Sequence, residues 1–371
     1  MADRFPGRVG LQQRILPSYR APFFDLLAGA CEGGLSVFAG QATPREGVNA
    51  AAGLRAAQHH PAKNHHFRTP GDRWYFCWQS GLLDWLSEWD PEILIMEANP
   101  RYLSSPRGLR WMRRRNRPVI GWGLGAPAGR GALEGARLRR QVQFLRQFEA
   151  LVTYSGQGAE EFKSLGIDPA RIFVAPNAVA PRPKETVMRP LPGDGRPLNV
   201  LFVGRLVERK QVDRLILACE LLPRSLQPRL VVVGDGPARP ELETLARSHY
   251  PNTTFAGAVH GPELSQHYVS ADLFVLPGTG GLAIQEAMSF GLPVIVGRGD
   301  GTQTDLVRPE NGWNAAGGSP QDLANTLQLA LEDPHRLRRM GAESYRIVHE
   351  EINLEEMVRV FVRVLNEFAP R

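Results

Sequence analysis

The chain has 371 residues, of which 43% are hydrophobic and 22% charged, as in a soluble globular protein long enough for two domains. No apolar run approaches the ~20 residues that span a bilayer, and the first residues lack the apolar core of a secretory signal. Three widely spaced cysteines (Cys31, Cys77 and Cys219) fit neither a disulfide framework nor a zinc site, so we expect a reducing cytoplasm.

The net charge of +6 is unevenly spread along the chain. The first 180 residues carry 23 basic and 15 acidic side chains, whereas the remainder carries 21 and 23. The basic excess gathers in residues 107–119 and 137–148. Such segments are typical of a solvated helix face, or of a surface that docks on an anionic membrane or on polyanions, and these interpretations stay open. We do not expect nucleic acid as a partner, because no binding motif accompanies the charge.

The first half of the chain predicts strands with intervening helices. Residues 8–14 are the first strand candidate, and 21–31 are a helix that Pro22 opens near its first turn. Further apolar runs predict strands at 92–97, 118–123, 150–155 and 171–177. A segment rich in Pro and Gly then follows without periodicity, and it predicts an interdomain linker.

The second half alternates more regularly. Apolar runs predict strands at 198–204, 229–236, 253–259, 273–277 and 294–296. Helical spacing predicts helices at 211–222, 240–250, 263–270, 282–290 and 320–333, and again near the end of the chain. The pattern favours an α/β fold with doubly wound parallel sheets, each binding ligands at the carboxyl ends of its strands.

The predicted organisation is two Rossmann-like domains with a ligand cleft between them. We expect an amino-terminal domain over residues 1–180, a linker over 181–197 and a carboxyl-terminal domain over 198–345. The last residues, 346–371, are expected to form a helix that packs back on the amino-terminal domain.

Two stretches of the second half have side chains suited to a phosphorylated ligand. In "FVGRLVERK" (202–210) a strand ends at Gly204, and Arg205 and Lys210 follow it. Two cations at a strand's carboxyl end suit a diphosphate, although surface salt bridges are the alternative. In "PGTGGLAIQEAMSFGLPVI" (277–295), glycines precede a helix that carries Glu286, a carboxylate suited to a ribose diol. The alternative for this stretch is a structural turn with a solvated glutamate. "GDGP" (234–237) does not complete GxGxxG, so a nicotinamide site is not supported.

Taken in order, these stretches resemble the GT-B glycosyltransferases of glycosyltransferase family 4. The resemblance lies in "VGRLVERKQVDRLI", "LVVVGDGPARPELE", "FAGAV…ELSQHYVSADLFVLP" and "GLAIQEAMSFGLPVIV", and it covers nearly all of residues 198–330. It implies the GT-B fold, in which two Rossmann-like domains face a cleft. The amino-terminal domain then binds the acceptor, and the carboxyl-terminal domain binds a nucleotide sugar.

The resemblance also implies roles for individual residues. Arg205 and Lys210 match the pair that binds the donor's pyrophosphate, and Glu286 matches the second glutamate of the EX7E motif, which contacts the ribose. These three are the expected catalytic residues. The other expected donor-binding residues are Gly204, Val259, His260, Thr279, Gly280, Gly281 and Leu282. On the acceptor side we expect Tyr19 and Arg20 before the first helix, and Glu97 and Asn99 at the end of a strand.

The sequence departs from the family pattern at two places. Position 278, where the first glutamate of EX7E belongs, is Gly278. Near the amino-domain loop where the family commonly has a histidine, the residues are Trp122 and Leu124.

The function implied by the resemblance is retaining transfer of a sugar from a nucleoside diphosphate, without a metal or cofactor. The expected acceptor is a polysaccharide or a lipid-linked glycan. The expected location is the cytoplasm, at the inner face of the membrane if the basic domain docks there. The alternative is a transfer-inactive protein that binds nucleotide sugars or acts as a scaffold, and Gly278 is the residue that favours it.

Overall fold

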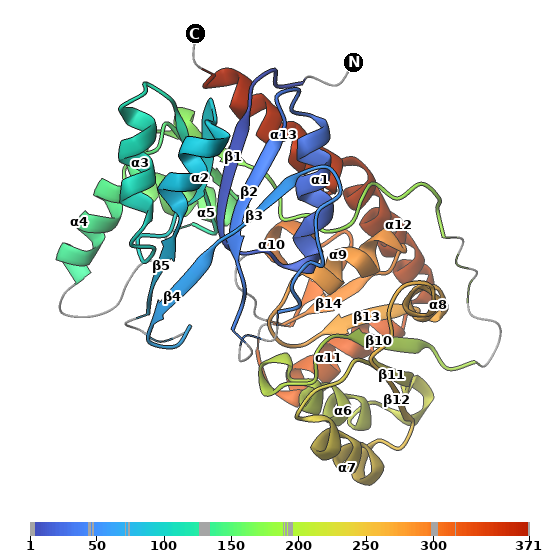
Figure 1. Ribbon diagram of the computed structural model, residues 1–371. Helices are drawn as coiled ribbons and strands as arrows, with labels where there is room; N and C mark the ends of the chain where they lie inside the picture. Colours follow the sequence, from blue (N-terminus) through green and yellow to red (C-terminus); the bar gives the residue numbers. More distant parts are fainter. Residues whose placement is uncertain are drawn as a thin grey trace. The chain divides into compact units, whose positions relative to one another are not determined.

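The computed structural model (Figure 1) describes residues 4–43, 46, 48–70, 72, 75–125, 134–187, 189, 191, 196–297, 303–315 and 317–369. The chain forms two compact units. Unit 1 comprises Met1–Val179 and Leu354–Arg371, and unit 2 comprises Ala180–Asn353. The boundary expected at residue 345 falls inside helix α12 (Pro334–Glu350), so unit 2 extends further along the chain than the sequence pattern suggested.

Unit 1 contains a parallel sheet with the strand order β3-β2-β1-β6-β7-β8-β9. Five of its strands were predicted: β1 (Val9–Ile15), β6 (Ile93–Glu97), β7 (Val119–Gly123), β8 (Ala150–Thr153) and β9 (Ile172–Val174). The strands β2 (Leu35–Gly40) and β3 (Gln58–Pro61) were not predicted. The strand β3 lies at the sheet edge and is mostly exposed, so its polar sequence carries no strand signal. The antiparallel pair β4 (Lys63–Phe67) and β5 (Phe76–Ser80) was also missed.

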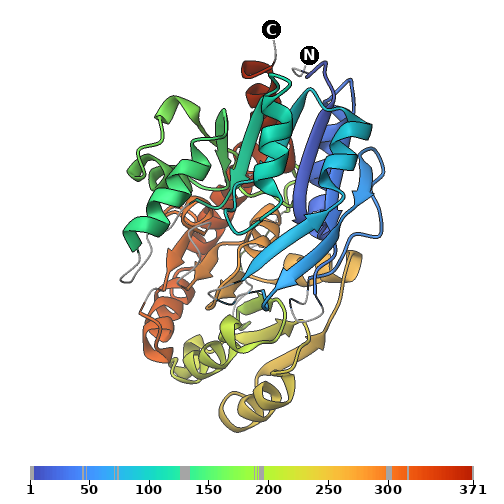
Figure 2. The same ribbon diagram turned by 60° about the vertical axis from the view of Figure 1, so that its left-hand side comes forward.

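The side chains of this sheet alternate between two apolar clusters, one on each face. Ile93 and Ile95 belong to the first cluster, whereas Leu94 and Met96 belong to the second. Helices α1 (Ala21–Gly29) and α13 (Leu354–Glu367) contribute to the first cluster and lie side by side (Figure 1). Four helices contribute to the second: α2 (Leu82–Trp89), α3 (Ser105–Arg113), α4 (Glu134–Leu145) and α5 (Gly156–Ser164). In Figure 2 the teal α3 lies in front of the sheet and the red α13 behind it.

Unit 2 contains a second parallel sheet, with the order β12-β11-β10-β13-β14-β15. Its strands are β10 (Asn199–Val203), β11 (Arg229–Val233), β12 (Thr253–Gly257), β13 (Leu273–Leu276), β14 (Val294–Val296) and β15 (Gly312–Asn314). Its α-helices are α6 (Val212–Glu220), α7 (Arg239–His249), α8 (Pro262–Ser270), α9 (Leu282–Ser289), α10 (Gln303–Leu306), α11 (Pro320–Leu331) and α12. The structure confirms the strands and helices predicted between 198 and 333 to within about two residues at most ends.

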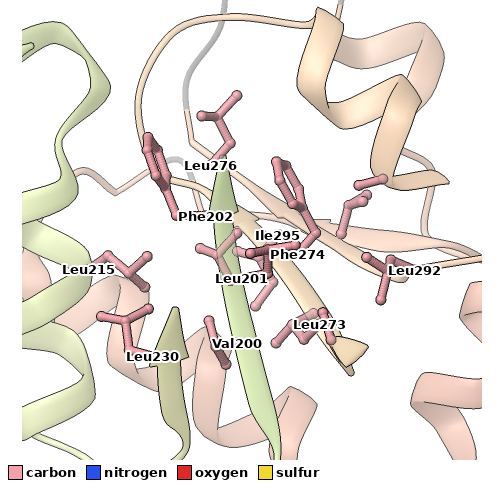
Figure 3. Close-up of a cluster of buried hydrophobic side chains, with 14 of the residues drawn as sticks. Val200, Leu201, Phe202, Leu215, Leu230, Leu273, Phe274, Leu276, Leu292 and Ile295 are labelled. Carbon is pink, nitrogen blue, oxygen red and sulfur yellow. The ribbon is translucent and has the colours of Figure 1, made fainter. Parts of the chain in front are cut away.

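The central strand β10 is anchored by apolar side chains on both faces. Figure 3 shows Val200, Leu201 and Phe202 packed among side chains from the neighbouring strands and helices. All three are at most 1% exposed. Burial of one such side chain contributes roughly 1.5–3 kcal/mol, so the ends of these strands are firmly held. The loops that follow them therefore start from a rigid base.

Candidate active site

The candidate donor residues lie at the topological switch point of the unit 2 sheet. After β10 the chain adds β11 and β12 on one side, and it then returns to place β13 on the other side. The connections that leave β10 and β13 therefore lead toward opposite edges of the sheet, and such a switch point is where open α/β sheets bind ligands. Gly204, Arg205 and Lys210 follow β10, and the glycine loop 277–281 follows β13.

The structure brings these two stretches into contact. The Thr279 amide donates a hydrogen bond to the Arg209 carbonyl at 3.1 Å, and the Arg209 guanidinium donates to Thr279 Oγ1 at 3.3 Å. The Lys210 ammonium lies so close to Gly280 that a Cβ on this glycine would collide with it. The Lys210 side chain also passes Gly204, with Cε 3.7 Å from the position of a Cβ there. A positive charge is thus held between two glycines that leave their backbone accessible.

Arg205 differs from Lys210 in its surroundings. Its side chain is exposed and forms no ion pair with any residue that the structure describes. Lys210 is half-buried at the end of the 3-10 turn Glu208–Lys210. One cation is therefore fixed by packing, while the other is able to reorient toward a ligand.

The "GDGP" turn after β11 packs against the loop that follows β10. A Cβ on Gly234 would collide with the Gly204 carbonyl, and the Leu206 amide donates to the Asp235 carbonyl at 2.9 Å. Gly236 approaches the Leu206 carbonyl in the same way. These glycines thus allow two backbone segments to pack closely.

Gly278 packs directly on the segment that carries Lys210. A Cβ at position 278 would collide with the Arg209 carbonyl oxygen and lie 2.6 Å from the Cα of Lys210. No side chain fits there without movement of backbone. The loop arrangement is therefore incompatible with a glutamate at 278, whatever its chemistry.

The helix α9 presents both a free start and a carboxylate. Gly281 is its N-cap residue, and no side chain caps the helix through a described hydrogen bond, so backbone N–H groups near Leu282 are available to an anion. Glu286, one turn further on, is half-buried, and its Oε2 accepts a hydrogen bond from the Tyr268 hydroxyl at 3.2 Å. Burial raises the pKa of Glu286, and the bond from Tyr268 opposes this shift.

Gln303 is a buried residue of the site that the sequence analysis missed. Its side chain is 2% exposed, and its Nε2 donates to the Gly280 carbonyl. The side chain thereby fixes the peptide of the glycine loop that faces Lys210. A single glutamine at the start of a four-residue helix carries no signal in the sequence.

Val259 and His260 lie at the same edge of the sheet but further out. They follow β12, which is two strands from β10, or about 10 Å at the usual strand spacing. Val259 packs partly on the core, and His260 is exposed just before Gly261, where the backbone turns with a φ of 61°. This separation suits the outer end of an extended nucleotide rather than its phosphates.

Two of the acceptor-side candidates lie at the switch point of unit 1, between β1 and β6. Glu97 ends β6, and its carboxylate accepts a hydrogen bond from the Arg14 amide. Burial raises the pKa of Glu97 to about 7. Asn99 follows two residues later and accepts from the Arg101 amide at 3.1 Å. The nearby Arg14–Glu46 ion pair, at 2.5 Å and with both side chains at most 15% exposed, was not predicted.

The other two acceptor-side candidates have contrasting environments. Tyr19 is 40% exposed. Arg20 is 5% exposed, and its guanidinium donates to Asn177 Oδ1 and to the Ala178 carbonyl. This guanidinium also lies 5.5 Å from the centre of the Trp122 ring. The Arg20 side chain is thus buried and engaged in contacts inside unit 1, and its expected role toward the acceptor stays a prediction.

Trp122 and Leu124, near the loop where the family commonly has a histidine, also differ in their surroundings. Trp122 is 1% exposed and packs in the core between Phe23 and Phe361. Leu124 is 58% exposed. Trp122 is therefore part of the hydrophobic core.

A comparison with known proteins identifies the second half of the chain. Residues 183–347 match the family described as Glycosyl transferases group 1. This part of the chain belongs to the group 1 glycosyl transferases.

The match to individual relatives covers only part of this chain and part of each relative. Sulfoquinovosyl transferase SQD2 of Arabidopsis thaliana is 35% identical over 163 residues, which are 41% of this chain and 31% of the relative. The GDP-mannose-dependent alpha-mannosyltransferase of Mycobacterium tuberculosis (strain CDC 1551 / Oshkosh) is 42% identical over 128 residues, 34% of this chain and 31% of the relative. The match thus spans about a third of the length of either relative.

The fold of both units together is that of the GT-B glycosyltransferases. Sucrose-phosphate synthase of Thermosynechococcus elongatus aligns with a TM-score of 0.71 over 97% of this chain and 98% of its own. At 17% sequence identity this likeness shows the fold alone. The GT-B fold expected from the sequence is confirmed.

Beyond the glycosyl transferase domain, unit 1 has a basic hollow on α3. A cavity of about 200 Å³ is lined by Leu83, Trp111 and four arginines: Arg107, Arg110, Arg114 and Arg115. The four arginines are exposed, and none forms an ion pair with a described residue. We call this surface the arginine hollow.

In the part of the chain that the structure describes, no cluster of three or more His, Cys, Asp or Glu side chains has the arrangement of a metal site. Likewise, none of the helices in that part of the chain combines the length and apolar character that crossing a membrane requires.

Proposed function

We propose that this protein transfers a sugar from a nucleoside diphosphate sugar to a hydroxyl of a glycan or lipid-linked acceptor, with retention and without a metal. The observation that carries the proposal is the position of the Lys210 ammonium, which packs against Gly280 at the β10/β13 switch point. The exposed Arg205 and the uncapped start of α9 belong to the same edge of the sheet. Together they offer cationic and N–H donors to two phosphates.

These groups suit a reaction in which the diphosphate is the leaving group. In retaining transfer by front-face attack, the leaving phosphate takes the acceptor's proton while negative charge grows on its oxygens. Lys210 and Arg205 would neutralise that charge, and the fixed loops would orient the donor. A charge-assisted hydrogen bond contributes about 1.5–3 kcal/mol, so loss of either cation should slow transfer by tenfold or more.

The remaining donor residues have roles that follow from their order along the sheet edge. Glu286 would accept from the ribose diol, and the backbone near Val259 and His260 would contact the base. The similar mannosyltransferase is GDP-mannose-dependent, so a hexose on a guanosine diphosphate is the first donor to test.

The test is a thermal-shift titration of the full chain with GDP, UDP, ADP and their hexose conjugates, followed by assays of nucleoside diphosphate release. We expect one of these nucleotides to stabilise the protein. Its apparent affinity in the titration should be at least tenfold lower in Lys210→Met and in Arg205→Met. Arg224→Met, an exposed arginine elsewhere in unit 2, is the matched control. No stabilisation by any nucleotide would refute the proposed function. Transfer that persists in EDTA, with the product anomer matching the donor's, would support metal independence and retention.

A second candidate is a protein that binds nucleotide sugars without transferring them. Gly278 favours it, because the carboxylate that the family places there is missing. Stabilisation by a nucleotide sugar without release of nucleoside diphosphate, across varied acceptors, would support this candidate over the enzyme.

The arginine hollow is a basic surface on unit 1 that is suited to docking on a membrane. We propose that it binds the anionic surface at the inner face of a membrane, which would bring the protein to a lipid-linked acceptor. Sedimentation with vesicles containing anionic phospholipid should fall with salt and in Arg110→Gln/Arg114→Gln. Binding that resists both changes would exclude an electrostatic surface.

A further inference from the structure

The two helices α8 and α9 are joined by a buried hydrogen bond that ends on a candidate ligand-binding carboxylate. Tyr268 on α8 is 0% exposed, and its hydroxyl donates to Glu286 Oε2 on α9 at 3.2 Å. Its ring stacks on Phe290, with 5.1 Å between the ring centres and 14° between their planes. The ring is therefore fixed, and the hydroxyl points in one direction.

This bond occupies one of the two carboxylate oxygens. Oε1 of Glu286 accepts no hydrogen bond from any described residue, and the side chain is half-buried rather than enclosed. A carboxylate held through one oxygen presents the other to a ligand in a defined orientation. Donation by the hydroxyl also favours the ionised form that accepts hydrogen bonds best.

The relative position of the two helices is held by Arg189. Its guanidinium donates to the carbonyls of Tyr268 at 2.6 Å and of Val269 at 3.0 Å at the end of α8. It also donates to the carbonyl of Phe290 at the end of α9, at 2.8 and 3.1 Å. One cation thus binds the last carbonyls of both helices, where a positive charge is favourable. The distance between Tyr268 and Glu286 is thereby held by a contact outside the pair.

A second buried tyrosine in unit 2 shows what a purely structural hydroxyl does. Tyr250 is 3% exposed, and its hydroxyl donates to the backbone carbonyl of Pro228. The Tyr268 hydroxyl instead donates to an ionisable side chain whose second oxygen can accept from a ligand. Tyr250 is therefore a matched control for Tyr268.

We propose that Tyr268 is a positioning residue: it holds one oxygen of Glu286 so that the other accepts hydrogen bonds from the ribose diol of a bound nucleotide. The inference rests on the proposed function, because it requires a nucleotide at the β10/β13 edge. The ribose contact of Glu286 is what the family resemblance already implied, and the inference adds Tyr268 as the residue that orients this carboxylate.

The test compares a ribonucleotide with one that lacks the diol. Dissociation constants of the full chain are measured for GDP or UDP, whichever binds more tightly, and for the 2′,3′-dideoxy form of the same nucleotide. Tyr268→Phe should weaken ribonucleotide binding about five- to tenfold and leave the dideoxy form unchanged. Tyr250→Phe should change neither constant. Thermal unfolding of both variants establishes that they are folded.

A double-mutant cycle separates positioning from general packing. In the Glu286→Gln background, Tyr268→Phe should add less than a twofold further loss of ribonucleotide affinity, because its effect passes through the carboxylate. Two results would assign Tyr268 to packing alone and overturn the proposal. One is that Tyr268→Phe lowers ribonucleotide affinity as much in the Glu286→Gln background as in the wild type. The other is that Tyr268→Phe weakens binding of the dideoxy form as much as binding of the ribonucleotide. If Tyr268→Phe and the wild type distinguish the ribonucleotide from its dideoxy form equally well, the proposal also fails, while nucleotide binding and the proposed function stand. If the wild type binds no nucleotide, both fall together.

Discussion

The residue Gly278 is required by the backbone opposite it. Any Cβ at this position would collide with the Arg209 carbonyl and the backbone of Lys210. A Cβ at Gly280, two residues further on, would collide with the Lys210 ammonium. The missing EX7E glutamate is therefore tied to a local packing arrangement in which the glycine loop lies directly on the cation-bearing turn. If transfer occurs, another group must contact the donor sugar where the family uses that carboxylate.

Restoring the glutamate should therefore harm this protein. Gly278→Glu and Gly278→Ala should both lower the free energy of unfolding of unit 2 by about 1–3 kcal/mol, because backbone must move to admit Cβ. Urea denaturation measures this. Gly29→Ala is the control, since nothing lies within 4 Å of its added Cβ, and it should be neutral or stabilising. A stable Gly278→Glu with faster transfer would show that the loop relaxes freely.

Glu97 is the residue from which we expect a pH dependence near neutrality. Its pKa in the folded state is about 7, raised by burial from the ordinary value of 4.5. The folded state therefore binds this proton more tightly than the unfolded state does. The resulting stability is present below the unfolded pKa and is lost as the pH rises through about 7.

The prediction is that the wild type loses stability between pH 5 and pH 8 by about 1.4 kcal/mol for each unit of the Glu97 shift, and that Glu97→Gln abolishes this loss. The measurement is urea unfolding of both proteins across that range. Glu88→Gln, an exposed carboxylate on α2, should leave the wild-type slope unchanged. Parallel pH curves for Glu97→Gln and the wild type would contradict the assignment.

At the scale of elements, the connecting segment before β10 does more than link two units. Its Arg189 binds carbonyls at the ends of α8 and α9, including that of Ala271, and burial lowers its pKa to about 10. A guanidinium with this pKa remains charged at neutral pH. The two helices that carry Tyr268 and Glu286 are thus held by a residue from a stretch without periodicity.

Removing this contact should loosen both helices. Arg189→Met leaves several backbone carbonyls without their donor, and we expect a loss of about 2–4 kcal/mol in the stability of unit 2. Hydrogen exchange should show faster exchange in α8 and α9 than in α6 and α7. Uniform exchange across all four helices would argue against a local clamp. Arg224→Met again provides an exposed control.

At the scale of the whole molecule, the end of the chain returns to unit 1. Phe361 on α13 is 1% exposed and packs edge-on against Phe23 and Trp122, with ring centres 5.1 and 5.0 Å away. The core of unit 1 is therefore complete only when the last helix is present. Folding of this unit depends on contacts between residues more than two hundred positions apart.

Phe361→Ala should destabilise unit 1 by about 3–5 kcal/mol, because it opens a cavity among fixed aromatic rings. Six of the seven tryptophans lie in the unit 1 segments, so tryptophan fluorescence follows mainly this unit during unfolding. Arg359→Ala, whose side chain is 69% exposed on the same helix, should change stability by less than about 0.5 kcal/mol. Similar midpoints for both variants would contradict the role of Phe361.

The sequence by itself determined most elements of unit 2 and the candidate cations and glycines, because apolar periodicity and strand-end motifs are local signals. The helix that carries Glu286 is such a case. Only the tertiary structure decided that Gly278 packs on Lys210, that Tyr268 meets Glu286 and that Arg20 is buried against Asn177 and Trp122. Each of these depends on which distant segments come together, and a local pattern shows that a side chain will be buried without showing what it will be buried against.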